Sequence, residues 1–146
     1  MGLARRAAVA PALAVLLAAC GGRGGRAPEP TASGSLGTVT ASDARVLVAA
    51  LCELEGPAAT DPDRAGRIFY DRAHEALHVL AAAVEPVDRA AAAALLVAKE
   101  RVEADLAGPG LSDAFPDHAA HLLEATRAAL GAVGLPAPSC DDGTLG

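Results

Sequence analysis

The stretch RAHEALHVLAAAVEPVDRAAAAALLVAKERVEADL, residues 72–106, decides the fold class of this chain. Apolar residues recur in it every three to four positions on both sides of Pro86, which is the spacing of amphipathic helices. Pro86 ends the first of these helices because the residue before a proline is pushed out of the helical region. No part of the chain alternates between apolar and polar residues for long enough to make a strand. The sequence therefore predicts an all-α protein.

Two more helices flank this pair. We expect helices at residues 42–55, 63–85, 87–106 and 112–133. Thr40 or Ser42 can cap the first helix, and Pro116 is tolerated because it falls in the first turn of the last one. Short connections favour antiparallel neighbours, so the sequence predicts a small up-down four-helix bundle.

The expected core positions follow from the helical period of the last three helices. In the second helix they are Tyr70, Ala73, Leu77, Leu80, Ala81 and Val84. In the third they are Ala91, Leu95, Ala98, Val102 and Leu106, and in the fourth Phe115, Leu122, Ala125, Ala129 and Val133. Lys99 falls on the apolar side of its helix, with Glu103 one turn further on. We expect these two to form an ion pair, with the lysine stem lying along the apolar seam.

The N-terminus has the features of an export signal. Arg5 and Arg6 precede an apolar run that is too short for the roughly 20 residues of a membrane-spanning helix. The run ends in Leu17-Ala18-Ala19-Cys20, which resembles the lipobox of bacterial lipoproteins. This resemblance implies cleavage before Cys20, acylation of Cys20, and a mature protein anchored on the extracytoplasmic face of the cell membrane or envelope. An ordinary secretory signal cleaved after Ala19 is the alternative.

These features divide the chain into three parts. They are a signal peptide at residues 1–19, the lipidated Cys20 with a flexible linker at 20–39, and the helical bundle domain at 40–146. The net charge is −6, and aromatic residues make up 2% of the chain. An acidic chain with so few aromatics lacks both the phosphate-binding patch and the stacking platform of nucleic-acid binders. We therefore expect no nucleic acid as partner, but the membrane through the acyl chains on Cys20 and a protein of the envelope.

The chain has three cysteines, and the lipid anchor would use Cys20. Outside the cytoplasm the remaining pair, Cys52 and Cys140, predicts a disulfide, with two free thiols as the alternative. In an up-down bundle the fourth helix ends near the start of the first. Cys52 lies most of the way along that first helix. We therefore expect the C-terminal tail to run along the first helix and to be pinned there.

The HEALH motif, residues 74–78, fits the H-E-x-x-H pattern of zinc metallopeptidases. His74 and His78 lie one helical turn apart, a spacing that suits two imidazoles on one metal ion. Glu75 would act as the base on a metal-bound water.

A catalytic zinc also needs a third protein ligand. By resemblance to the zincins, which covers only these five residues, Glu100 or Glu103 falls in the expected window. Charged residues flank the motif, and no strand is available to hold a substrate backbone. These facts favour a polar rim on an amphipathic helix over a peptidase.

A second histidine pair, His118 and His121, occurs in the fourth helix. If the second and fourth helices face each other, the four histidines could form a zinc or copper site like those in bundle cores. Alternatively, His74 and His118 are rim or core histidines with ordinary hydrogen bonds, and His78 and His121 are exposed. We expect no cofactor on this second interpretation, which we favour.

The sequence thus predicts a small extracytoplasmic lipoprotein that acts as a non-catalytic accessory or interaction module. A metal-binding lipoprotein that uses the paired histidines is the first alternative, and a minimal zinc metallopeptidase is the second.

Overall fold

The computed structural model describes residues 38–143. Its elements are α1 (Ala41–Glu55), α2 (Pro62–Ile68), the π-helical turn η1 (Phe69–Ala73), α3 (His74–Val84), α4 (Arg89–Leu106), α5 (Phe115–Ala132) and the 3₁₀ turn η2 (Cys140–Gly143). Because α2, η1 and α3 follow one another without a break, the described chain forms four long helices, and it contains no strand. The predicted all-α helical bundle is confirmed. The predicted signal peptide and most of the predicted linker lie outside the described residues.

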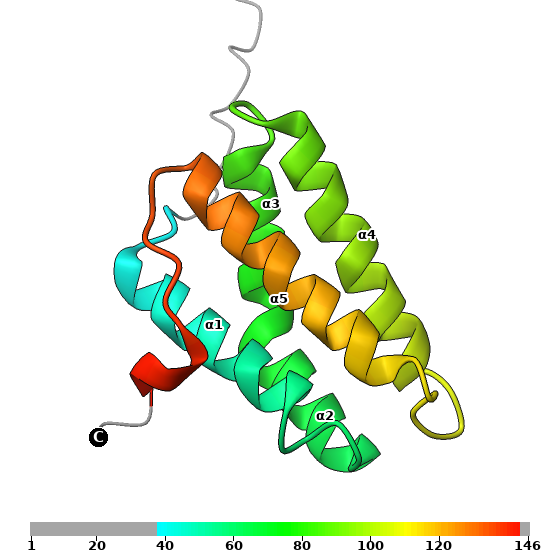
Figure 1. Ribbon diagram of the computed structural model, residues 1–146. Coiled ribbons are helices and arrows are strands. Elements are labelled where there is room, and N and C mark those ends of the chain that lie inside the picture. The colour runs from blue at the N-terminus through cyan, green and yellow to red at the C-terminus, as the bar shows by residue number, and fades with distance from the viewer. Residues whose placement is uncertain (1–37, 144–146) are drawn as a thin grey trace, which may run out of the picture. The chain divides into compact units, whose positions relative to one another are not determined.

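The four helices pack as antiparallel neighbours (Figure 1). α4 packs against both α3 and α5, and α1 packs against α5 and η1, so the last helix closes the bundle onto the first. In Figure 1 the C-terminal end of α5 lies near the start of α1. This arrangement brings the C-terminal tail to the surface of α1.

The helix starts are set by short side-chain caps. Thr40 and Asp43 form a capping box at α1, in which each side chain accepts from the other residue's backbone N–H. The Asp61 and Asp88 carboxylates accept from backbone N–H groups in the first turns of α2 and α4. Pro116 sits in the first turn of α5, as the sequence predicts.

The end of α5 depends on a glycine. Gly134 adopts φ 73°, in the left-handed region that favours glycine. This turn lets the Leu135 N–H donate to the Leu130 carbonyl at 2.9 Å, which satisfies one of the last free carbonyls of the helix. The chain therefore leaves α5 in a fixed direction.

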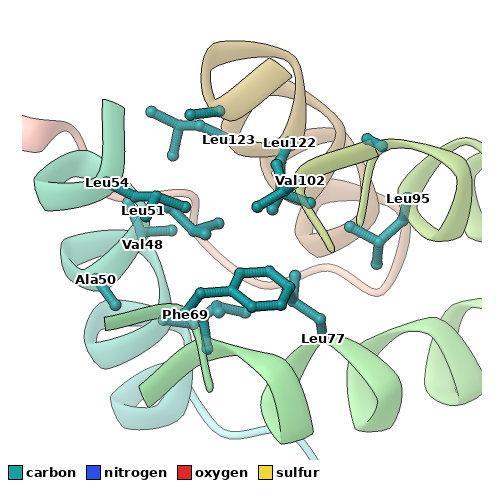
Figure 2. Packing of buried hydrophobic residues seen from close by; sticks show 14 of the residues in the cluster. Val48, Ala50, Leu51, Leu54, Phe69, Leu77, Leu95, Val102, Leu122 and Leu123 are labelled. Atoms are coloured by element: carbon teal, nitrogen blue, oxygen red, sulfur yellow. The ribbon is translucent and has the colours of Figure 1, made fainter. Parts of the chain in front are cut away.

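The core is built mainly from leucines and alanines of all four helices, with two phenylalanines. The largest fully buried side chains include Phe69, Phe115, Leu47, Leu51, Leu54, Leu77, Leu80, Leu95, Leu122 and Leu130. Figure 2 shows the Phe69 ring pointing into this core, which contains Leu51, Leu77 and Leu122 from three different helices.

The predicted core stripe of the second helix is wrong at Tyr70. That side chain is 51% exposed, whereas Phe69 beside it is fully buried. The cause is the π-helical turn η1, whose wider i→i+5 hydrogen bonding takes an extra residue into one turn. The extra residue rotates the preceding part of the helix, so that Phe69 instead of Tyr70 lies on the same face as Ala73 and Leu77.

The stripes of the other two helices need smaller corrections. In α4, Ala92 and Lys99 are buried, while the predicted Ala91 and Leu106 are only partly buried. In α5 the buried positions are Phe115, Ala119, Leu122, Leu123, Thr126, Ala129 and Leu130, while Ala125 and Val133 are only partly buried. Each predicted stripe is narrower than the observed face, because α4 and α5 each contact helices on two sides.

The C-terminal tail is held against α1. Cys52 and Cys140 form a disulfide, with a Cα–Cα distance of 5.5 Å. Pro136 and Pro138, which precede Cys140 in the sequence, lie beside the first half of α1. The predicted pairing and the predicted course of the tail are confirmed.

Candidate functional site

A polar network joins α3 to α4 and includes the first histidine of the HEALH motif. His74 Nε2 lies 2.9 Å from Glu103 Oε1, so the carboxylate accepts a hydrogen bond from the ring. Lys99 Nζ donates to the other carboxylate oxygen, Glu103 Oε2, at 2.8 Å. The expected ion pair between Lys99 and Glu103 is confirmed, and the structure adds His74 as its third member.

The electrostatics of this network follow from its burial. The Lys99 side chain is 5% exposed, and those of Glu103 and His74 are 28% and 31% exposed. Burial by itself raises the pKa of Glu103, but the hydrogen bonds and charges of Lys99 and His74 outweigh it and leave that pKa below its ordinary value. The carboxylate is therefore ionised at neutral pH and balances the buried ammonium.

The π-helical turn places aromatic rings around the same histidine. The rings of Phe69, Tyr70 and His78 all lie edge-on or tilted to the His74 ring, with the His78 centroid at 4.8 Å. Phe69 packs from the core side, and Tyr70 and His78 are exposed. The sequence gives no signal for this cluster, because hydrophobic period does not reveal a π turn.

The second histidine pair has a separate environment. His118 Nδ1 lies 2.7 Å from Asp105 Oδ2, and the Ser112 hydroxyl donates to the other oxygen of the same carboxylate. His121 is exposed and lines a shallow groove between α4 and α5, together with Arg101. This pair thus faces α4 from α5, whereas His74 faces α4 from α3.

The two histidine pairs do not form one metal site. Across residues 38–143, no group of three or more histidine, cysteine, aspartate or glutamate side chains lies close enough together to hold a metal ion. His74 and His118 each hydrogen-bond to a different carboxylate of α4, Glu103 and Asp105. The interpretation of these two as rim histidines with ordinary hydrogen bonds describes the observed contacts.

The structure also places the residues of the peptidase hypothesis. Glu103, one of the two candidate third ligands, reaches His74, but it is also bound by Lys99. Glu100, the other candidate, is exposed. Glu75, the candidate base, is exposed on the side of α3 that adjoins a groove lined by Tyr70 and Asp43. The second histidine of the motif, His78, is exposed and has a ring contact with His74 but no carboxylate partner among the described residues.

The described residues contain no helix that is both long and apolar enough to cross a bilayer. Comparisons with protein-family models, with curated proteins and with solved structures each gave no match to this chain.

Proposed function

We propose that this chain is an extracytoplasmic lipoprotein, anchored in the membrane through acyl chains on Cys20, whose helical bundle is a non-catalytic accessory or interaction module. The observation that carries the proposal is the pairing of Cys52 with Cys140. The sequence has three cysteines, and the one outside this bond, Cys20, is the cysteine that follows Leu17-Ala18-Ala19. A structural disulfide also fits an oxidising compartment outside the cytoplasm.

The contacts of the HEALH motif support a role without catalysis. His74 hydrogen-bonds to a carboxylate whose charge is already balanced by Lys99, so the three groups tie α3 to α4. A catalytic zinc needs free ligands and an open coordination position, and a Glu103 that is bound by an ammonium does not supply them. The same contacts count against the alternative of a metal-binding lipoprotein.

The anchor is tested by replacing Cys20 with alanine in the full chain. The wild-type protein is expected to sediment with membranes. Its intact mass should equal that of the polypeptide from residue 20 onward plus the mass of the acyl chains. Cys20→Ala should lose both properties, because the acylated side chain is missing. Ser33→Ala, in the same linker, is the matched control and should keep both. A wild-type protein with an unmodified N-terminal cysteine, or one that begins elsewhere, would refute the anchor.

A further inference from the structure

A groove of about 590 Å³ lies between α1 and the C-terminal tail. Its lining is mainly apolar. One wall is formed by Val46, Val48 and Ala49 of α1, and the other by Pro136, Ala137 and Pro138 of the tail. This volume is within the range of about 300–1,000 Å³ that is typical of small-molecule sites.

The tail wall of this groove is fixed at both ends. At the start, the Leu135 N–H is bonded to the Leu130 carbonyl at the end of α5. At the far end, the disulfide holds Cys140 on α1. Pro136 and Pro138 restrict the backbone between these points and have no N–H group to donate. The wall is therefore stiff and cannot swing away from α1.

The α1 wall has an apolar side chain that the fold leaves open to solvent. Val46 is 56% exposed, and Val48 beside it is 1% exposed and forms part of the core. A ligand with an apolar body would cover Val46 and the proline rings together. Such burial is favourable in proportion to the apolar area removed from water.

One charge marks the end of the groove near the start of α1. Arg45 lines the groove and, among the described residues, has no ion-pair or hydrogen-bond partner. At the opposite end of the groove, the Arg127 guanidinium of α5 donates to the Sγ atom of Cys140 at 3.4 Å. Because Arg127 is engaged with Cys140, whereas Arg45 lines the groove itself, an anionic head is favoured at the Arg45 end, with the apolar body of the ligand directed toward the disulfide.

We infer that this groove binds a single-chain anionic amphiphile, such as a fatty acid or a lysophospholipid, with its head group on Arg45 and its chain between α1 and the tail. The guanidinium recognises either a carboxylate or a phosphate. This inference needs only the stapled bundle and does not depend on acylation of Cys20.

The test uses a dodecanoate probe with a photoreactive diazirine on its chain. The full chain, as purified, is mixed with phosphatidylcholine vesicles and the probe and then irradiated, and the modified peptides are mapped by mass spectrometry. Labels are expected on α1 near Val46 and on the tail near Pro138. Arg45→Glu should lower this labelling about fivefold, as expected for loss of a partly solvated ion pair. Arg67→Glu, at an exposed position of α2, is the matched control and should leave the labelling unchanged.

Further arms separate the apolar and ionic parts of the site. Ala49→Leu fills the groove without removing the charge and should also lower the labelling. A dodecanol probe of equal chain length should label less than the dodecanoate probe. Displacement by unlabelled dodecanoate points to a carboxylate and displacement by lysophosphatidate to a phosphate, and either supports the site. The inference is overturned if neither competes, if labels fall outside the groove, or if Arg45→Glu behaves like Arg67→Glu.

Discussion

Replacing Glu103 by glutamine leaves the ammonium of Lys99 in the bundle without its countercharge. Lys99 is only 4% exposed, so little water reaches its ammonium in place of the lost carboxylate. Removing one partner of a fully buried ion pair costs about 3–5 kcal/mol. Because Glu103 is itself 28% exposed, we expect a smaller loss of about 2–3 kcal/mol in the free energy of unfolding.

Urea unfolding at neutral pH, followed by far-UV circular dichroism, measures this loss. Glu100→Gln is the matched control, because it changes the same charge on an exposed position of α4. That control should change the stability by less than about 0.5 kcal/mol. In the double variant Lys99→Met, Glu103→Gln, the buried charge is also gone, and most of the stability should return.

The pH dependence of the same difference follows from the lowered pKa of Glu103. A carboxyl whose pKa is lower in the folded than in the unfolded state stabilises the fold above its ordinary pKa of 4.5. That contribution is lost as the pH falls through the lower, folded value. The gap between wild type and Glu103→Gln should therefore persist at neutral pH and shrink in acid below 4.5. If Glu103→Gln costs no more than Glu100→Gln at neutral pH, the proposed role of the network is wrong.

Four further outcomes are expected. Replacing Cys52 and Cys140 together by serine should lower stability by about 4 kcal/mol in urea unfolding, because the bond closes a long loop, and an unchanged midpoint would contradict this. Phe69→Ala should cost about 3–5 kcal/mol, while Tyr70→Ala should cost less than about 0.5 kcal/mol; equal losses in thermal unfolding would disprove the π-shifted register. Thr40→Ala should cost about 1 kcal/mol through the lost capping box, as measured by the same melts. Protein dialysed after equilibration with zinc or copper should retain neither by elemental analysis, and stoichiometric metal would restore the metal-site alternative.

The fold could be predicted because the residues that start and end its helices act on their near neighbours in the sequence. Thr40, Asp61 and Pro86 mark helix ends through chemistry that depends only on near neighbours, and the helices begin and end within about three residues of the expected positions. The disulfide could be predicted because two cysteines remain once Cys20 is assigned to the lipid anchor, and the short tail can reach along α1 to Cys52.

The candidate site could be predicted only in part. Lys99 and Glu103 are one turn apart on the same helix, so their contact follows from spacing alone. The contact of His74 with Glu103 depends on how α3 is rotated against α4, which spacing within either helix does not show. Residue spacing also does not show where the histidines of α3 and α5 point: in the described residues His74 and His118 each bond to a carboxylate of α4, and no group that could hold a metal is formed.

The disulfide also decides how the domain responds to tension. A force applied between the two ends of the described chain enters α1 and crosses directly from Cys52 to Cys140, which are 88 residues apart in the sequence. Everything between these cysteines, including α3, α4 and α5, lies outside the load path. Stretching can peel the first turns of α1 and the last residues of the tail, but the rest of the bundle stays mechanically shielded until the sulfur–sulfur bond breaks.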